Sequence, residues 1–184
     1  LETFASKDQS IICLYGKCQD SETPFLPWAE ALGKLGLSKL LLGDADKKGR
    51  GGKKEKPGPE DAQGPKEERF LLFENVADAI RKMAEKTPYL IIIDDLQWAD
   101  TSSRELFYYV ARNTISSRVL LLGIYRSEEL DKDSTDLMER MSREGLMDTR
   151  HVERLGKTDV RDMIRNRYGT APEHFVDAVY AKTE

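Results

Sequence analysis

Three short runs of apolar residues along the chain predict buried β-strands. They lie at residues 11–15 (IICLY), 89–93 (YLIII) and 119–125 (VLLLGIY). Uninterrupted apolar character is typical of strands that are covered on both faces, as in a parallel sheet. A fourth, weaker strand candidate lies at residues 151–155.

Apolar residues at helical spacing fill the intervals between these runs. A first helix is predicted over residues 27–42, and a second begins at Arg69 and ends before Pro88. Ser102 and Glu105 stand at the spacing of a capping box and predict a third helix that starts near Ser102. The apolar residues expected on the buried faces of the first two helices are Trp28, Ala31, Leu32, Leu35, Phe70, Phe73, Val76, Ala77, Ile80 and Met83.

Two more helices are predicted near the carboxyl end of the chain. Thr158 caps a helix that runs to about Arg167 and stops at Gly169, and Pro172 opens a last helix through Tyr180. Because strands and helices alternate along the chain, we expect an α/β fold with a parallel sheet and helices on both of its faces.

The composition changes sharply at residues 43–68, where Gly, Pro, Lys, Glu and Asp replace almost all apolar side chains. Such a segment cannot bury enough apolar surface to offset the entropy lost on ordering, which predicts a disordered insertion. The expected organisation is an α/β core of residues 1–42 and 69–156, the insertion at 43–68 and a helical segment at 157–184.

The overall composition argues against several classes of function. The chain has 184 residues, a net charge of −4 and 34% charged residues, so no direct nucleic-acid binding is expected as its main function. No apolar run approaches the ~20 residues that cross a bilayer, so no membrane contact is expected. Cys13 and Cys18 are too few for a disulfide framework and lack the second pair of a zinc site, which favours two thiols in a reducing cytoplasm.

The candidate chemistry lies in residues 90–100, LIIIDDLQWAD. Four apolar residues deliver Asp94 and Asp95 to the carboxyl end of a strand, where open parallel sheets bind their ligands. A carboxylate beside phosphates can hold Mg²⁺ through water, and a second one can polarise an attacking water. Side chains of adjacent strand residues point to opposite faces, so both can share a site only if the chain turns there. Taken alone, the pattern fits equally a strand end followed by a helix-capping acid.

This string resembles the Walker B segment of AAA/STAND-type P-loop ATPase modules, which occur in LuxR-type transcription regulators and in fusions of a predicted ATPase to a cyclase or kinase. Two further segments are similar to the family in the same order. Residues 16–32 (GKCQDSETPFLPWAEAL) resemble the segment after its second strand, and residues 120–130 (LLLGIYRSEEL) resemble its sensor strand. The resemblance implies a parallel P-loop NTPase sheet of the ASCE type, with residues 157–184 as the start of a carboxyl-terminal helical lid.

The resemblance also implies roles for individual residues. Asp94 is expected to be the Mg²⁺ ligand, and Asp95 is expected to orient or activate the hydrolytic water. Arg126 is expected to sense the γ-phosphate of ATP, a task suited to a planar, permanently charged side chain. An ordinary exposed arginine at a strand end is the alternative. Trp98 and Asp100 are expected to be structural, with Trp98 packed under the turn and Asp100 starting the next helix.

One part of the family pattern is missing from the chain. No segment reads G-x-x-x-x-G-K-[ST], the loop that holds the phosphates with its backbone N–H groups and its lysine. In the family this loop and its strand precede the strand expected at residues 11–15, so we expect the chain to be a fragment. The missing strand lies inside the family's sheet, which predicts an unfilled slot beside residues 119–124. An unpaired edge there would favour self-association.

Two functions remain open at this point. The first is a regulatory switch, in which Mg²⁺ and ATP binding and slow ATP hydrolysis set the state of effector domains in the same polypeptide. The fragment alone is then expected to be inactive and to have no functionally significant affinity for ATP or Mg²⁺. The second is a non-catalytic α/β protein-interaction module that works without nucleotide. An intact phosphate-binding loop upstream would favour the first.

Overall fold

The chain forms two compact units. The computed structural model describes residues 11–19, 23–42 and 66–183. The first unit is Leu1–Met147 and the second is Asp148–Glu184.

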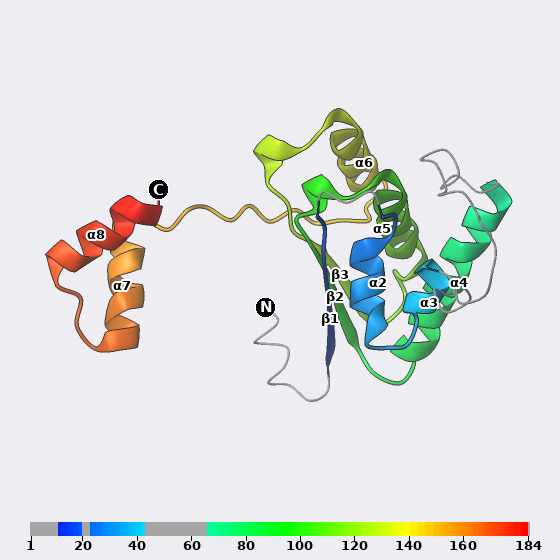
Figure 1. The fold of residues 1–184 in the computed structure, drawn as a ribbon, viewed down its shortest axis with the longest axis horizontal. Helices are drawn as coiled ribbons and strands as arrows, with labels where there is room; N and C mark the ends of the chain where they lie inside the picture. Colours follow the sequence, from blue (N-terminus) through cyan, green and yellow to red (C-terminus); the bar gives the residue numbers. More distant parts are fainter. Residues whose placement is uncertain (1–10, 20–22, 43–65, 184) are drawn as a thin grey trace, which may run out of the picture. The chain divides into compact units, whose positions relative to one another are not determined.

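A three-stranded parallel sheet lies at the centre of the first unit (Figure 1). Its strands β1 (Ile12–Lys17), β2 (Tyr89–Asp94) and β3 (Val119–Gly123) stand in the order β1-β2-β3, which confirms the predicted parallel α/β arrangement. Among the strands that the structure describes, β3 pairs on one side only, with β2. The unfilled slot beside it stays a prediction.

The main core lies between the sheet and the helices that pack on one of its faces. Helices α2 (Leu26–Gly33), α4 (Lys66–Ala84) and α5 (Thr101–Asn113) gather on the same side of the strands (Figure 1). The side chains of β2 are buried from its first to its fifth residue because this strand has a neighbour on each side. The opposite face carries a smaller cluster of Leu90 and Ile92 with Ile11, Cys13, Tyr15 and Leu122.

Two of the predicted helices differ from the observed ones, one by a break and one in its start. The helix predicted over residues 27–42 is in fact two helices, α2 and α3 (Ser38–Leu42). Gly36 adopts a left-handed φ of 72° between them, a conformation that glycine reaches without strain. Helix α4 begins at Lys66, inside the insertion predicted at residues 43–68, whose earlier residues lie outside the described part of the chain.

Helix α5 begins at Thr101, with Asp100 as its N-cap. The Asp100 carboxylate accepts hydrogen bonds from the backbone N–H of Ser103 at 2.9 Å and from its hydroxyl. Asp100 therefore starts the helix, as expected. The capping box predicted from Ser102 and Glu105 is wrong, because the carboxylate one residue before the helix already satisfies the exposed N–H groups of the first turn.

Helix α6 (Lys132–Arg143) is not predicted by the sequence, because charged and polar residues make up most of it. Its N-cap is Asp131, whose side chain accepts the Ser134 N–H at 2.7 Å. Arg104, a buried residue of α5, donates to both oxygens of Asp131 at 2.8 Å. This charged contact ties α6 to α5.

Replacing Asp131 with Asn is expected to remove a pH-dependent part of the stability. Hydrogen bonds from Arg104 and Ser134 lower the pKa of Asp131 from 3.8 to about 2. As the pH falls through 3.8, the unfolded chain takes up its proton before the folded chain does. The free energy of unfolding that this carboxylate contributes is therefore present above that pH and is lost towards pH 2.

Urea unfolding measured across this pH range checks the Asp131 prediction. The decline in stability towards low pH should be smaller for Asp131→Asn than for the wild type. Asp133→Asn, at an exposed position in the first turn of the same helix, is the matched control and should decline like the wild type. Equal declines in all three proteins would contradict the assignment.

The second unit is a pair of helices, α7 (Lys157–Tyr168) and α8 (Glu173–Thr183). The N-cap of α7 is Gly156 and not the predicted Thr158, because the Asp159 side chain reaches back to the Gly156 N–H at 2.8 Å. The helix ends at Gly169, as predicted. The small core of this unit is made of Val160, Ile164 and Val176.

The strand proposed from the sequence at residues 151–155 does not form. These residues adopt neither helix nor strand, and the Val152 side chain is 87% exposed. An extended segment forms the hydrogen bonds of a sheet only if another strand lies beside it. A short apolar–polar alternation in the sequence does not show whether such a strand is present.

Candidate functional site

Asp94 and Asp95 lie at the carboxyl end of β2, the central strand. Asp94 is the last residue of the strand, and Asp95 has a left-handed backbone conformation with a φ of 53°. Few residues other than glycine adopt this conformation. Here it turns the chain into a short 3₁₀ helix, η2 (Leu96–Trp98). The turn allows two adjacent carboxylates to face the same side of the sheet, which a continued strand would forbid.

Both carboxylates contact side chains of β1. The Tyr15 hydroxyl donates to Asp94 Oδ2 at 2.8 Å, and the Lys17 ammonium nitrogen lies 3.0 Å from Asp95 Oδ2. Tyr15 and Lys17 are two residues apart, so they share one face of the strand. Asp95 raises the pKa of Lys17 by accepting its hydrogen bond and by its negative charge. Neither β1 residue was predicted from the sequence, although the sheet register pairs Lys17 with Asp94 and Tyr15 with Ile92, two residues earlier.

Arg126 approaches this site from the segment after β3. Its guanidinium binds Glu129 Oε1 at 2.8 Å, within the 3₁₀ helix η3 (Ser127–Glu129). This hydrogen bond raises the pKa of Arg126, and the nearby Asp95 adds to the effect. The side chain is largely exposed. Contact between Arg126 and a phosphate stays a prediction.

Gln97 connects these parts, and the sequence analysis did not single it out. Its side-chain nitrogen lies 3.4 Å from Asp95 Oδ1 and 3.3 Å from Glu129 Oε2. Its side-chain oxygen accepts the backbone N–H of Arg126 at 3.3 Å. The residue is only 6% exposed. A polar residue directly after an Asp-Asp-Leu turn is the one sequence signal that could have pointed to it.

The two tryptophans have opposite environments. Trp28 is fully buried, as expected, and its indole N–H donates to the Ser103 carbonyl at 3.0 Å. Trp98 is 47% exposed, so the prediction that it packs under the turn is wrong. In the 3₁₀ turn the buried positions belong to its neighbours Leu96 and Gln97, which leaves Trp98 on the outside.

Gly16 allows the end of β1 to lie against the start of α2. A Cβ atom at this position would stand 1.8 Å from the Pro27 carbonyl oxygen and 2.7 Å from its carbon. Backbone atoms cannot give way as a flexible side chain does, so Gly16→Ala is expected to reduce the free energy of unfolding by about 3 kcal/mol. Urea unfolding measures this change.

Gly33 provides the matched control for Gly16. It lies at the end of α2, and an added Cβ would meet no atom within 4 Å. Gly33→Ala should leave the stability unchanged or raise it by up to about 1 kcal/mol, because alanine favours the helix. If both variants unfold at the wild-type midpoint, the close approach at Gly16 is wrong.

Cys18 follows β1 directly and is not a candidate nucleophile. Its side chain is buried, and this burial, with smaller effects of Asp100, Asp95 and Asp94, raises the pKa of the thiol to about 12. A neutral thiol is a poor nucleophile at neutral pH.

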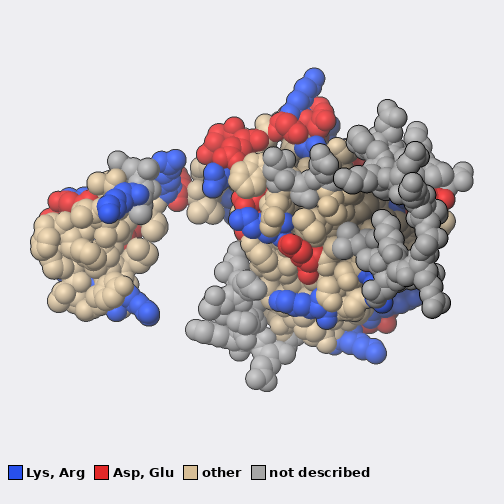
Figure 2. All heavy atoms as spheres, in the orientation of Figure 1, with Lys and Arg blue, Asp and Glu red and all other residues tan. Residues whose placement is uncertain are grey.

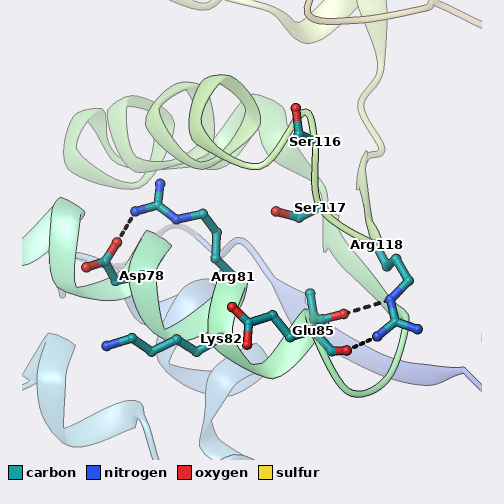
Figure 3. Close-up of a pocket in the computed structure, with 8 residues that line it drawn as sticks. Asp78, Arg81, Lys82, Glu85, Ser116, Ser117 and Arg118 are labelled. Atoms are coloured by element: carbon teal, nitrogen blue, oxygen red, sulfur yellow. Dashed lines mark hydrogen bonds and ion pairs between the residues drawn. The ribbon is translucent and has the colours of Figure 1, made fainter.

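A cavity of about 410 Å³ lies at the other end of the sheet, near the ends of α4 and α5 (Figure 3). Arg118, which directly precedes β3, donates to the Ala84 carbonyl at 2.9 Å and also contacts the Glu85 carbonyl. These bonds satisfy carbonyl groups that the end of α4 leaves without helical partners. Arg118 is thus engaged in holding the helix end, and the cavity is remote from Asp94 along β2.

Charge distribution and helix length describe the surface of the chain. Figure 2 shows acidic and basic side chains interspersed on the face in view, without a broad basic area. In the described part of the chain, no helix is both long enough and apolar enough to span a membrane.

The Asp94 carboxylate fits the oxygen donors that Mg²⁺ prefers. Each of its oxygens accepts one hydrogen bond, from the Tyr15 hydroxyl or from the Asp95 N–H, which leaves lone pairs for an ion or its waters. Among the described residues, no three His, Cys, Asp or Glu side chains gather into a metal site. Mg²⁺ prefers octahedral coordination, so an ion held by Asp94 would need further ligands.

Comparison with known protein families defines the class of this chain. It belongs to the AAA ATPase domain family, whose model matches residues 1–122. The chain is therefore an ATPase-type module with a P-loop NTPase-like α/β fold, of a family that in general binds nucleotide and Mg²⁺. The matched segment includes Asp94 and Asp95 and ends before Arg126. No curated protein and no solved structure matched the chain.

Proposed function

We propose that this chain supplies the Mg²⁺-binding and water-activating side of an ATP-hydrolysing regulatory switch. The observation that carries the proposal is the turn at Asp95, which places two adjacent carboxylates on one face at the carboxyl end of the central strand. Ligands of open parallel sheets bind at that end. The family membership supports the choice of a nucleotide as the ligand.

The three proposed site residues have different roles, which follow from the chemistry of their side chains. Asp94, held by Tyr15, would bind Mg²⁺ through water. The ion would neutralise charge on the phosphates. Asp95 would accept a hydrogen bond from the attacking water and so orient it towards the γ-phosphate. The Arg126 guanidinium would exchange its bond to Glu129 for a bond to the phosphate, because the Glu129 carboxylate and the phosphate are anions that compete for it.

A non-catalytic interaction module remains the second candidate. The exposed Trp98 beside the site favours it, because exposed aromatic residues are enriched where proteins bind one another. The two candidates differ in their need for nucleotide. The complete gene product that contains this chain should hydrolyse ATP only with Mg²⁺ present, and removing Mg²⁺ with a chelator should abolish turnover. Absence of both nucleotide binding and turnover in that protein would leave the interaction module as the function.

The 184-residue chain by itself is expected to bind Mg-ATP no better than about millimolar. Its sequence has no phosphate-binding loop of the P-loop pattern. One arginine contributes roughly 1.5–3 kcal/mol to anion binding. This does not exceed an association cost of at least about 4 kcal/mol. Calorimetric titration measures the affinity, and saturable binding at low micromolar concentration would show that these residues include a phosphate site.

A further inference from the structure

The Gln97 amide is buried where three charged or polar partners converge. It lies in η2, between the carboxylate turn after β2 and the segment after β3. A buried amide is costly unless its oxygen and its two N–H groups find partners. Here the oxygen faces the Arg126 N–H, and the nitrogen faces the carboxylates of Asp95 and Glu129.

The partners determine the orientation of this amide. A backbone N–H can only donate, so the Gln97 oxygen must face Arg126. Ionised carboxylates can only accept, so the Gln97 nitrogen must face Asp95 and Glu129. A flipped amide would turn all three contacts into repulsions. No other uncharged side chain of this length offers one acceptor and two donors in a plane.

These contacts join two segments that are far apart in the sequence. Gln97 and Glu129 are separated by 32 residues, and Glu129 in turn binds the Arg126 guanidinium at 2.8 Å. The result is a continuous chain of contacts, Asp95–Gln97–Glu129–Arg126. The backbone beneath it is also held, because the Leu96 N–H donates to the Ile124 carbonyl at 2.9 Å.

We infer that Gln97 is a positioning residue that couples the place of the Asp95 carboxylate to that of the Arg126–Glu129 segment. The inference rests on the proposed function for its catalytic consequence, but the coupling itself is a property of the folded chain. A shift of the Glu129 carboxylate, which also binds Arg126, removes one of the two carboxylates that hold the Gln97 nitrogen. Asp95 then becomes its remaining carboxylate partner, so the two proposed site residues respond together.

The first experiment tests the coupling in the 184-residue chain without nucleotide. Glu129→Gln is made alone and together with Gln97→Met, and the backbone amide signal of Asp95 is followed by NMR. The substitution at Glu129 should move the Asp95 signal when Gln97 is present, and the movement should be lost in the Gln97→Met background. An equal movement in both backgrounds would overturn the coupling, whatever the protein does with ATP.

The second experiment tests the consequence in the complete gene product by measuring kcat and KM for ATP. Gln97→Met should lower kcat by on the order of 10- to 100-fold, as expected for a misplaced reacting group, with little change in KM. Gln97→Glu has the same shape as glutamine but sets a third carboxylate against Asp95 and Glu129, so its kcat should be lower still. A role in packing alone predicts the reverse order, and that order would overturn the inference.

Failure of the inference and failure of the proposed function are distinguishable. A wild-type gene product without ATP hydrolysis would refute the proposed function, and the NMR experiment would then decide the coupling alone. Normal wild-type hydrolysis together with wild-type kcat in both Gln97 variants would refute the positioning role and leave the proposed function standing.

Discussion

In the complete gene product, Asp95→Asn is expected to lower the rate of Mg-ATP hydrolysis by about 100-fold or more, the usual loss when a general base is removed. The asparagine keeps the size of the side chain but cannot take up a proton or orient water as a carboxylate does. Nucleotide affinity should change little, because Asp95 is not the proposed ion ligand. Steady-state hydrolysis and equilibrium nucleotide binding, measured on the same protein, check the two halves of this result.

Two controls separate the proposed roles at this site. Lys17→Met removes the ion pair with Asp95 but leaves the Asp95 carboxylate in place. If hydrolysis slows as much in Lys17→Met as in Asp95→Asn, the loss of rate comes from breaking the ion pair and not from removing the carboxylate. Asp94→Asn should instead weaken the Mg²⁺ dependence of nucleotide binding, because a charged ligand is lost. Wild-type turnover in Asp95→Asn, or unchanged Mg²⁺ dependence in Asp94→Asn, would refute the corresponding role.

Trp28→Ala is expected to reduce the free energy of unfolding of the chain by about 3–5 kcal/mol, the usual range for removal of a large buried side chain. Trp28 is fully buried in the main core, and its ring packs against Phe107 with a centroid distance of 6.3 Å. It also links α2 to α5 through the Ser103 carbonyl. Urea unfolding followed by circular dichroism measures the change.

The other tryptophan of the chain is the matched control. Trp98→Ala should reduce the stability clearly less than Trp28→Ala, because about half of the surface of Trp98 is already exposed to water. Trp28→Phe keeps most of the apolar volume but loses the hydrogen bond to Ser103, so it should cost about 1 kcal/mol. Trp28→Phe also tests the role of Trp28 if Trp28→Ala does not fold. Equal unfolding midpoints for Trp28→Phe, Trp98→Ala and the wild type would contradict the assignment of Trp28 to the core.

Helix boundaries show where sequence patterns stop being sufficient. The periodic apolar residues of α4 identify it, because one face of it must be buried. Helix α6 carries few such residues and depends on the contact of Asp131 with Arg104, which comes from an element about thirty residues earlier in the chain. Local spacing cannot reveal a contact with another helix such as the one between Arg104 and Asp131. At the start of α5 the cap is local, between Asp100 and Ser103, and the capping-box spacing at Ser102 was misleading.

The three parallel strands and the position of Asp94 and Asp95 follow from the sequence pattern, because apolar runs favour burial and the polar residues that end them lie at the ends of the strands. The side chains that contact these carboxylates could be identified only from the folded chain, because they come from distant parts of the sequence. Tyr15 contacts Asp94 across 79 positions of sequence. Gln97 points inward while Trp98 points outward, because the orientation of a turn residue depends on the partners that the fold brings to it.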